Sequence, residues 1–394
     1  MQRDANKNKK VLLGGLSYTW IVTLLLAISV LAMGACSSGS KPLQNGGARE
    51  ESAPFGLEKN SSKLQVGVVT VGPVSDWGWN YQQNQGRLGL EARLRDKVHT
   101  VLAENVPENA DVERVMDRMA DAGAKLIFST SYGYADFCLR VAKTRPNVIF
   151  MQAQAPISAP NANTYNAKIW EASYASGVVA AMVLKKETRF GFVGAQPIPP
   201  INWTVNSFTL GARSVNPAVT VDIVYTNSWN NPAAETEAVN SLAAQGVKVV
   251  YILVDSPIAG VQAAERAGIY SISHHADLSS FAPKGYLTGA MWDWTNVYVD
   301  VAKEVMAGTW KSEPMAGGFK EGYVKLAPFG PAVDGAGQQK ARDTIAKIVS
   351  GKLKIFEGPL VDNKGMQRVA KGEVLDVPKI VSMDWLVQGV RSAR

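Results

Sequence analysis

The chain changes character at residue 64, where short apolar runs begin to alternate with amphipathic stretches. The apolar runs, many of them β-branched, predict strands at 64–71, 99–103, 126–129, 148–152, 189–193, 220–225, 247–254, 269–273 and 286–291. The stretches between them have apolar residues at helical spacing and predict helices at 80–94, 109–122, 137–144, 170–184, 202–215, 232–245, 257–267 and 297–307. This alternation predicts an α/β protein whose parallel sheets are covered by helices on both faces.

The same pattern occurs twice along the chain, which predicts two similar units. Residues 63–394 are too many for one ordinary core. The segment 123–128 (GAKLIF) leads from a predicted helix into a predicted strand, and 246–251 (GVKVVY) does the same later in the chain. We therefore expect two lobes, each with its own doubly wound sheet.

The two lobes are expected at 63–187 and 188–296, and the segment 297–394 is expected to cross back between them. In that segment we predict strands at 322–326 and 354–356 and a helix at 337–350. Ligands of open parallel sheets bind outside the carboxyl ends of the strands. Two such lobes that face each other across a hinge would line a cleft with strand-end loops from both.

The first 36 residues have the pattern of an export signal. Basic residues between Arg3 and Lys10 precede an apolar run at 11–33, and small residues then lead to Cys36. This arrangement resembles a bacterial lipoprotein signal peptide, in which Cys36 would be lipidated and become the new N-terminus. The apolar run also has the length of an uncleaved transmembrane anchor. In both interpretations the rest of the chain lies outside the cytoplasm.

The segment 37–62 is rich in Gly, Ser, Asn and Glu and is predicted to be a flexible tether. With a lipidated Cys36, the tether would hold the folded part at the bacterial cell membrane, on its periplasmic side in a bacterium with two membranes.

Charge and cysteine content exclude two further classes of protein. The formal net charge is +7, but seven basic and four acidic residues lie in 1–62, so the folded part carries only +4. No dense Lys/Arg run interleaved with aromatic residues is present there, which argues against nucleic-acid binding. The two cysteines are Cys36 and Cys138, and Cys138 lies in a helical pattern as a small buried residue, so no structural disulfide is expected.

Candidate ligand-binding residues follow two strands of the first lobe. The run 75–80 (SDWGWN) comes after the first strand and supplies Asp76, Trp79 and Asn80. Tyr132 and Asp136 follow the third strand. A carboxylate, an aromatic face and an amide suit a flat ligand with hydrogen-bonding edges. Asn80 and Asp136 also fit the N-cap positions of the helices that begin beside them, and Trp79 fits ordinary packing.

The strand ends of the second lobe carry further candidates, namely Trp229, Asp255, Asp277, Trp292 and Trp294. A tryptophan from each lobe would sandwich a ring between two aromatic planes, which contributes about 1–3 kcal/mol for each stacked face. Trp229 fits equally well as a hydrophobic residue that packs over the following helix.

The adjacent residues His274 and His275 end one predicted strand, but they do not predict a metal site. Neighbouring residues in a strand point to opposite faces, and the chain has only His99 besides. No G-x-S-x-G elbow, phosphate loop or Gly-x-Gly-x-x-Gly stands at a strand–helix junction. We therefore expect no catalytic residues, no metal and no cofactor.

With these motifs in this order, the chain resembles the basic membrane protein family of ABC-transporter substrate-binding lipoproteins, in particular its purine nucleoside receptors. The resemblance covers roughly residues 62–370, and its marks are 66–69, 76–80, 132–136, 141–143, Pro146, 174–177, 191–194, 211–217, 225–229 and 348–351. It implies a type I periplasmic binding protein in which a purine base is stacked between aromatic side chains.

The resemblance also implies roles for single residues. Trp79 stands at the family's first stacking position, and Trp229 is matched to the second, with Trp203, Trp292 and Trp294 as alternatives. Asp136 matches the acidic residue that binds the base edge. Asp277 matches an acidic residue at the ribose end.

One departure changes the expected ligand. The family's nucleoside receptors carry a lysine after the strand that here ends at Met291, whereas this chain continues as WDW at 292–294. Both stacking positions are tryptophan rather than phenylalanine. The missing ribose-binding cation and the wider aromatic faces favour a free base such as adenine over a nucleoside.

The expected function is therefore that of a monomeric receptor that binds a purine nucleobase or nucleoside and hands it to the permease and ATPase of an ABC importer. Three alternatives remain at the level of sequence. The protein could be an extracytoplasmic purine-metabolising enzyme, it could deliver a ligand to a signalling partner, or it could bind a sugar or autoinducer.

Overall fold

The computed structural model describes residues 54–392. The predicted signal peptide with Cys36 and the first part of the predicted tether lie outside these residues. Among residues 54–392, none of the helices combines the length and the apolar character that a membrane span requires.

The first of two large sheets has the strand order β12-β6-β4-β3-β1-β2. All neighbours in this path are parallel, and the short strand β5 pairs antiparallel with β6. The strands are β1 (Leu64–Val69), β2 (Val98–Ala103), β3 (Leu126–Ser129), β4 (Ile149–Ala153), β5 (Ser158–Ala159), β6 (Ala162–Ala167) and β12 (Met315–Gly317).

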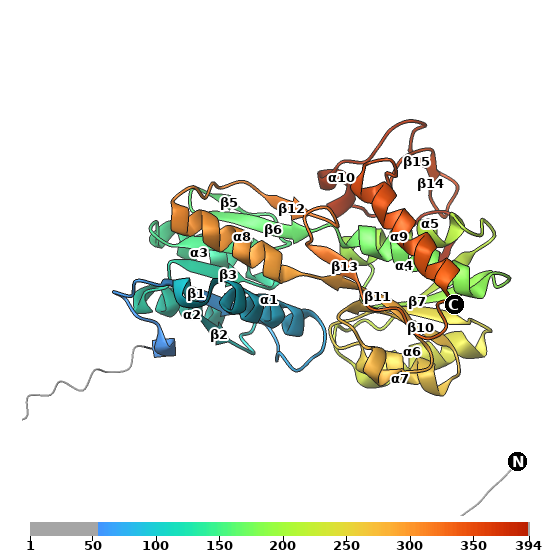
Figure 1. The fold of residues 1–394 in the computed structure, drawn as a ribbon, viewed down its shortest axis with the longest axis horizontal. Helices are drawn as coiled ribbons and strands as arrows, with labels where there is room; N and C mark the ends of the chain where they lie inside the picture. Colours follow the sequence, from blue (N-terminus) through green and yellow to red (C-terminus); the bar gives the residue numbers. More distant parts are fainter. Residues whose placement is uncertain (1–53, 393–394) are drawn as a thin grey trace, which may run out of the picture. The chain divides into compact units, whose positions relative to one another are not determined.

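The second sheet has the order β13-β11-β10-β9-β7-β8-β16, and only β13 runs antiparallel to its neighbour. Its strands are β7 (Arg189–Gly194), β8 (Thr220–Tyr225), β9 (Val249–Leu253), β10 (Tyr270–His275), β11 (Tyr286–Trp292), β13 (Val324–Leu326) and β16 (Val390–Ser392). The order β2-β1-β3-β4 in the first sheet matches β8-β7-β9-β10 in the second. The predicted pair of doubly wound parallel lobes is thereby confirmed (Figure 1).

The predicted helices are present with small shifts at their ends. They are α1 (Trp79–Leu94), α2 (Ala110–Ala122), α3 (Ala135–Thr144), α4 (Ile169–Leu184), α5 (Pro199–Arg213), α6 (Pro232–Ala244), α7 (Ile258–Arg266), α8 (Trp294–Ala307) and α9 (Gly335–Val349). Short 3₁₀ turns stand at η1 (Pro54–Gly56), η2 (Arg95–Lys97), η3 (Tyr132–Tyr134) and η4 (Ser279–Phe281).

The chain crosses between the lobes after β6, after β11 and after β12. Helix α8 packs against α1 on the first sheet, although it follows a strand of the second (Figure 1). Helix α4 packs against α5, α9 and β11, so it lies with the second sheet, whereas the boundary predicted at residue 187 puts it in the first lobe. Helix α4 is buried along most of its length because neighbours cover it on several sides.

The two ends of the described chain depart from the predictions. Leu57 is fully buried in the core of the first lobe and Phe55 packs beside it, so the predicted tether joins the fold before residue 62. The free thiol of Cys138 is buried in the same core. No strand forms at 354–356. Instead, the tail forms a hairpin and a short helix, namely β14 (Leu360–Val361), β15 (Gln367–Val369) and α10 (Val377–Val381).

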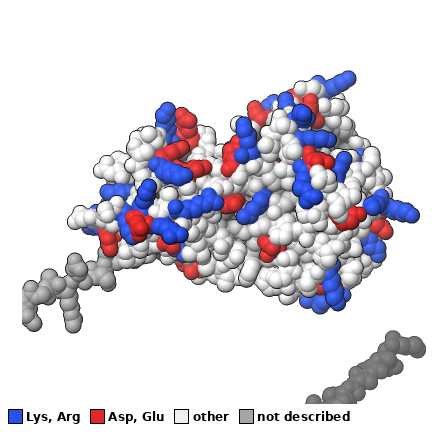
Figure 2. Space-filling view, viewed as in Figure 1, with Lys and Arg blue, Asp and Glu red and all other residues white. Residues whose placement is uncertain are grey.

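Charged side chains of both signs are interspersed over the face seen in Figure 2. This distribution agrees with the small net charge of the folded part and shows no basic patch on that face.

Candidate functional site

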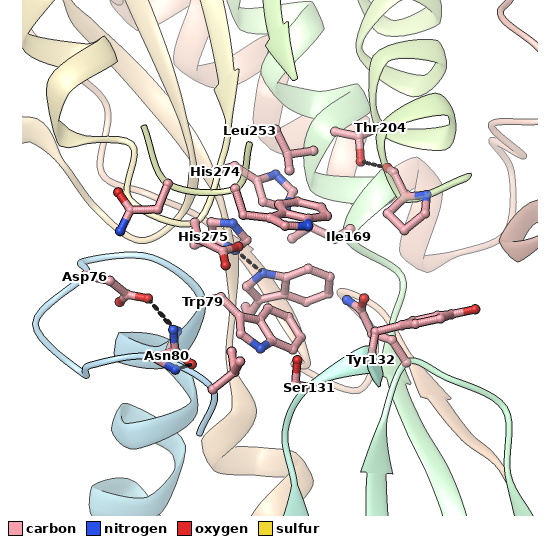
Figure 3. Close-up of a pocket in the computed structure, with 18 of the residues that line it drawn as sticks. Asp76, Trp79, Asn80, Ser131, Tyr132, Ile169, Thr204, Leu253, His274 and His275 are labelled. Carbon is pink, nitrogen blue, oxygen red and sulfur yellow. Dashed lines mark hydrogen bonds between the residues drawn. The ribbon is translucent and has the colours of Figure 1, made fainter. Parts of the chain in front are cut away.

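A cavity of about 340 Å³ lies between the two lobes, at the carboxyl ends of their strands. Figure 3 shows side chains of the first lobe, such as Trp79 and Ser131, facing Leu253 and His274 of the second. The cavity is lined by Val71, Gly72, Pro73, Asp76, Trp79, Asn80, Glu108, Ser131, Tyr132, Gln154, Ile169, Pro200, Trp203, Thr204, Trp229, Asn230, Leu253, Asp255, His274, His275 and Trp292.

Seven of the ten predicted ligand-binding residues line this cavity, and three do not. Those that line it are Asp76, Trp79, Asn80, Tyr132, Trp229, Asp255 and Trp292. Asp136 lies exposed in the first turn of α3, Asp277 accepts a hydrogen bond from the backbone N–H of Ser279 (2.9 Å), and Trp294 is buried in the core.

The carboxylate of Asp76 hydrogen-bonds within its own loop and at the start of α1. Its carboxylate accepts hydrogen bonds from the backbone N–H groups of Gly78, Asn80 and Tyr81 (2.8–2.9 Å) and from the Asn80 side-chain amide (2.8 Å). A negative charge at the positive end of a helix dipole is favourable there. Burial nevertheless raises the pKa of Asp76 above its usual value, against the opposite effect of these bonds. The carboxylate is therefore occupied by the loop and fixes its conformation.

Trp79 is the first residue of α1 and is held from several sides. Its indole N–H donates to the carbonyl of Thr130 (2.7 Å), and it packs edge-to-face against Trp292 (centroids 5.6 Å apart) and Trp294 (5.7 Å). Only 8% of its surface is exposed. Trp79 is therefore both a wall of the cavity and part of the packing between the lobes.

Two other tryptophans line the cavity from the second lobe. Trp229 is half-buried in the loop after β8, and its backbone carbonyl accepts a hydrogen bond from Asp255 N–H (2.7 Å). Trp203 lies in α5, is 3% exposed and has an indole N–H without a partner among the described residues. Its ring packs against Trp170 and the C-terminal tail.

Asp255 lines the cavity, and no cation among the described residues pairs with its carboxyl group. Among residues 54–392, no hydrogen bond or ion pair reaches its side chain. Burial, and then the negative charges of Asp76, Glu108 and Glu235, raise the pKa of Asp255 to about 8. Asp76 and Glu108 belong to the first lobe, and Glu235 to α6 of the second. Repulsion across the cavity therefore opposes ionisation of Asp255 while the lobes are together.

Glu108 is a cavity residue that sequence reasoning missed. Its carboxylate accepts hydrogen bonds from Ser131 Oγ (2.5 Å) and from the backbone N–H of Gly133 (3.0 Å). Asp136, which was expected at the cavity, instead lies exposed in the first turn of α3, directly after the turn η3. Glu108 follows β2 in the loop before α2, so its place after a strand end was the signal that could have identified it.

His274 and His275 also line the cavity, contrary to the expectation that they point to opposite sides of their strand. The backbone of His275 has a φ of 75°, which breaks the alternation at the end of β10 and leaves the two ring centroids 4.5 Å apart. His274 Nδ1 lies 2.7 Å from the hydroxyl of Tyr251. Burial lowers the pKa of both imidazoles, that of His275 to about 3.

The described lining of the cavity carries carboxyl and imidazole groups but no metal-binding cluster. Within the described part of the chain, no three His, Cys, Asp or Glu side chains come together to hold a metal ion. No lysine or arginine is among the described residues that line the cavity. What the cavity can do is enclose a small, largely flat molecule between indole rings and bind its polar edges.

Comparison with known proteins gives consistent results. Residues 63–357 match the family model described as ABC transporter substrate-binding protein PnrA-like. A purine-binding protein of Brucella abortus is 41% identical over 335 residues, which cover 85% of this chain and 95% of that protein. A putative ABC-transporter glucose-binding protein of Haloferax volcanii is 31% identical over 308 residues, 78% of each chain.

The fold is also that of solved solute-binding proteins. A solute-binding protein of an ABC transporter from Conexibacter woesei superposes with a TM-score of 0.64 at 20% identity, over 74% of this chain and 97% of that one. The architecture is thus that of type I periplasmic binding proteins, as predicted. Proteins of this kind act outside the cytoplasm, which agrees with the predicted location of the folded part. The chain belongs to the PnrA-like family of ABC-transporter substrate-binding proteins, and it is a solute-binding protein rather than an enzyme.

Proposed function

We propose that this protein captures a purine nucleobase, such as adenine, between its lobes and delivers it to the permease and ATPase of an ABC importer. The observation that carries the proposal is the lining of the cavity. Four tryptophans, Trp79, Trp203, Trp229 and Trp292, surround it, and the carboxyl group of Asp255 faces it without a protein partner.

A purine satisfies both parts of this lining. Indole rings stack on a base, and each stacked face contributes about 1–3 kcal/mol. An N–H or amino group of the base would donate to an oxygen of the Asp255 carboxyl group, which can accept a hydrogen bond in its protonated as well as its ionised form. Such a donor also offsets the repulsion that Asp76 and Glu108 exert on Asp255 across the cavity. The ligand would thus favour the arrangement in which the lobes are together.

Two observations favour the free base over the nucleoside in this proposal. A cavity of about 340 Å³ lies at the lower end of the range of roughly 300 to 1,000 Å³ for ligand sites. The described lining holds no lysine or arginine to bind a ribose hydroxyl. Lys325, which forms an ion pair with Asp293 of the 292–294 segment (3.2 Å), lies outside the lining.

The names of the relatives define the alternatives to be tested. The Brucella relative is named a purine-binding protein and shares more of its sequence with this chain than the Haloferax relative, which is named a putative glucose-binding protein. Sugars also stack on tryptophan, so glucose must be among the probes.

Isothermal titration calorimetry of the full-length protein in mild detergent tests the proposal. The probes are adenine, guanine, adenosine, guanosine and glucose. We expect adenine or guanine to bind one-to-one at micromolar or lower concentration, about 8 kcal/mol or more. Tighter binding of either nucleoside would reject the preference for the free base, and binding of glucose alone would reject purine binding.

We also propose that the mature chain begins at a lipidated Cys36 and is a monomer anchored to the cell membrane. Mass spectrometry of the chain expressed in a bacterium tests the first part, because lipidation adds acyl chains to a mature N-terminal Cys36. An unmodified N-terminus that retains residues 1–35 would instead support an uncleaved anchor. Size-exclusion chromatography with light scattering tests the oligomeric state.

A further inference from the structure

A hydrogen bond between two cavity residues determines where the proton of His275 lies. The indole Nε1–H of Trp292 donates to Nδ1 of His275 over 2.9 Å. An indole N–H is a donor only, so Nδ1 must be the acceptor and carries no proton. A neutral imidazole has one proton, and it therefore lies on Nε2.

The opposite side of this ring has no partner that meets hydrogen-bond geometry among the described residues, although the backbone carbonyl of Val254 acts on the ring and opposes the lowering of its pKa. His275 is 4% exposed, it lines the cavity, and its Nε2 is buried without a hydrogen-bond partner among the described residues. Burial lowers the pKa of His275 to about 3, so the ring is neutral at physiological pH. A buried N–H with no acceptor is costly, and such groups in folded proteins are usually satisfied by a ligand or by water.

The surrounding structure holds this ring in place. His275 adopts a φ of 75°, a conformation that few residues other than glycine take up, and which often marks functional sites. The ring packs edge-to-face against Trp79 of the other lobe, with centroids 6.1 Å apart. It also lies 6.5 Å from Trp292, with the two ring planes 27° apart. The donor is therefore oriented by residues from both lobes.

We propose that His275 is a specificity-determining residue whose Nε2–H donates to an unprotonated ring nitrogen of the ligand, and that Trp292 is the positioning residue that fixes this donor. The inference rests on the proposed function and deepens it. Asp255 accepts hydrogen bonds and His275 donates one, so the site selects a heterocycle that has both a donor and an acceptor on its edges.

Deaza analogues of adenine test which ring nitrogen, if any, accepts this bond. The probes 1-deazaadenine, 3-deazaadenine and 7-deazaadenine each replace one ring nitrogen by C–H and keep the stacking surface. With the wild-type full-length protein, we expect one of the three to bind about 10- to 100-fold more weakly than adenine, because it leaves the His275 N–H unsatisfied. Equal binding of all three and adenine would overturn the role of His275.

Two variants show whether that penalty comes from His275. The substitution His275→Asn keeps a residue that tolerates positive φ and removes the imidazole donor. In this variant, adenine should bind more weakly than it binds to the wild type. The deaza analogue that the wild type binds most weakly should then bind as well as adenine does. The control is His99→Asn, since His99 lies outside the cavity and its side chain hydrogen-bonds to the carbonyl of Gly56, and its pattern should equal that of the wild type. A penalty that persists in His275→Asn overturns the inference.

The proton position can be observed directly, without any ligand. The chain has three histidines, so selective ¹⁵N labelling gives few signals. The ¹⁵N shifts of His275 should report a neutral ring with its proton on Nε2. In Trp292→Phe the donor to Nδ1 is lost, so the proton should redistribute toward Nδ1 and the deaza penalty should shrink. A proton on Nδ1 in the wild type, or an unchanged ring in Trp292→Phe, contradicts the inference.

These experiments distinguish an error in the role of His275 from an error in the proposed function. If no purine binds to the wild type, the proposed function is wrong and the role of His275 falls with it. If adenine binds and the deaza analogues behave alike in wild type and His275→Asn, only the role of His275 is overturned.

Discussion

Gly78 of the first lobe lies directly against the backbone carbonyl of Asp255 in the second. A Cβ atom at position 78 would come within 1.6 Å of that carbonyl oxygen and within 2.6 Å of its carbon. Only a residue without a side chain allows the two backbones to approach this closely. The contact lies beside Asp76, Trp79 and Asp255, which line the cavity, so the approach of the lobes and the closing of the site are the same event.

The substitution Gly78→Ala should therefore keep the lobes apart. We expect ligand affinity to fall by an order of magnitude or more, since a hinged protein can relieve the clash by opening while each lobe stays folded. Calorimetry measures the affinity, and small-angle X-ray scattering with and without ligand measures the closure. The control is Gly335→Ala at the start of α9, where a Cβ meets nothing within 4 Å. Wild-type affinity in Gly78→Ala would show that the contact is not required.

A second contact between the lobes involves a residue that does not line the cavity. Trp77 stacks on Tyr81 of its own lobe (centroids 4.8 Å apart) and meets Phe281 of the other lobe edge-to-face at 5.4 Å. Trp77→Ala and Phe281→Ala should each weaken ligand binding, because both remove an aromatic contact of the closed arrangement. A double-mutant cycle on the binding free energy should give a coupling of about 0.5–1.5 kcal/mol. Strictly additive effects would mean that the pair does not contribute to closure.

Two tryptophans of the cavity should respond differently to truncation. Trp79 is almost fully buried and packs against Trp292 and Trp294, so Trp79→Ala should lower the free energy of unfolding by about 3–5 kcal/mol with or without ligand. Trp229 is half-buried, so Trp229→Ala should cost about 1–3 kcal/mol of binding with a smaller change in stability. Thermal unfolding and calorimetry of both variants measure the difference. If Trp79→Ala instead lost mainly binding and Trp229→Ala lost mainly stability, Trp79 would be the stacking residue and Trp229 the packing residue.

Asp255 should make the unliganded protein less stable as the pH rises. An unfolded aspartate titrates near pH ~4, whereas burial and nearby carboxylates raise the pKa of Asp255 to about 8. Its contribution to stability is fully present below pH ~4 and is lost as the pH rises toward 8, because the unfolded chain ionises first. Asp255→Asn should match the wild type at low pH and exceed its stability by at least ~1 kcal/mol above pH 8. Denaturant unfolding across this range measures the effect.

The matched control for Asp255→Asn is Asp277→Asn. Asp277 lies outside the cavity, and an asparagine there can still accept the hydrogen bond from Ser279 N–H. Its stability profile should follow that of the wild type. If the stability of Asp255→Asn also followed that of the wild type across the pH range, Asp255 would not be the cause of the pH dependence.

The sequence predicted the parts of the site that follow from strand ends, and it missed those that depend on single backbone torsions. The loop with Asp76 and Trp79 and the loop with Trp229 were predicted to lie at one cleft, because the carboxyl ends of parallel strands meet there. His275 was not predicted to face it, since one positive φ at the end of β10 reverses the expected direction of its side chain.

Other differences arise from packing that a linear pattern does not show. Strand β6 has the sequence ANTYNA, which lacks an apolar alternation, but it lies inside the sheet between β12 and β4 and all its residues are buried. Asp136 was expected at the ligand, but it lies exposed in the first turn of α3, after the short 3₁₀ turn η3. Trp294 was expected at the ligand, but it stacks on Trp292 at 4.9 Å and faces the core between the lobes.

The crystal structure of the protein with adenine tests the central claim most directly. We expect density for one flat ring in the cavity, stacked on the indole ring of Trp79 or Trp229, with hydrogen bonds to the carboxyl group of Asp255 and to Nε2 of His275. Gly78 and Asp255 should remain in contact in that complex. A base bound elsewhere, or a ring in the cavity whose edges contact neither Asp255 nor His275, would contradict the account.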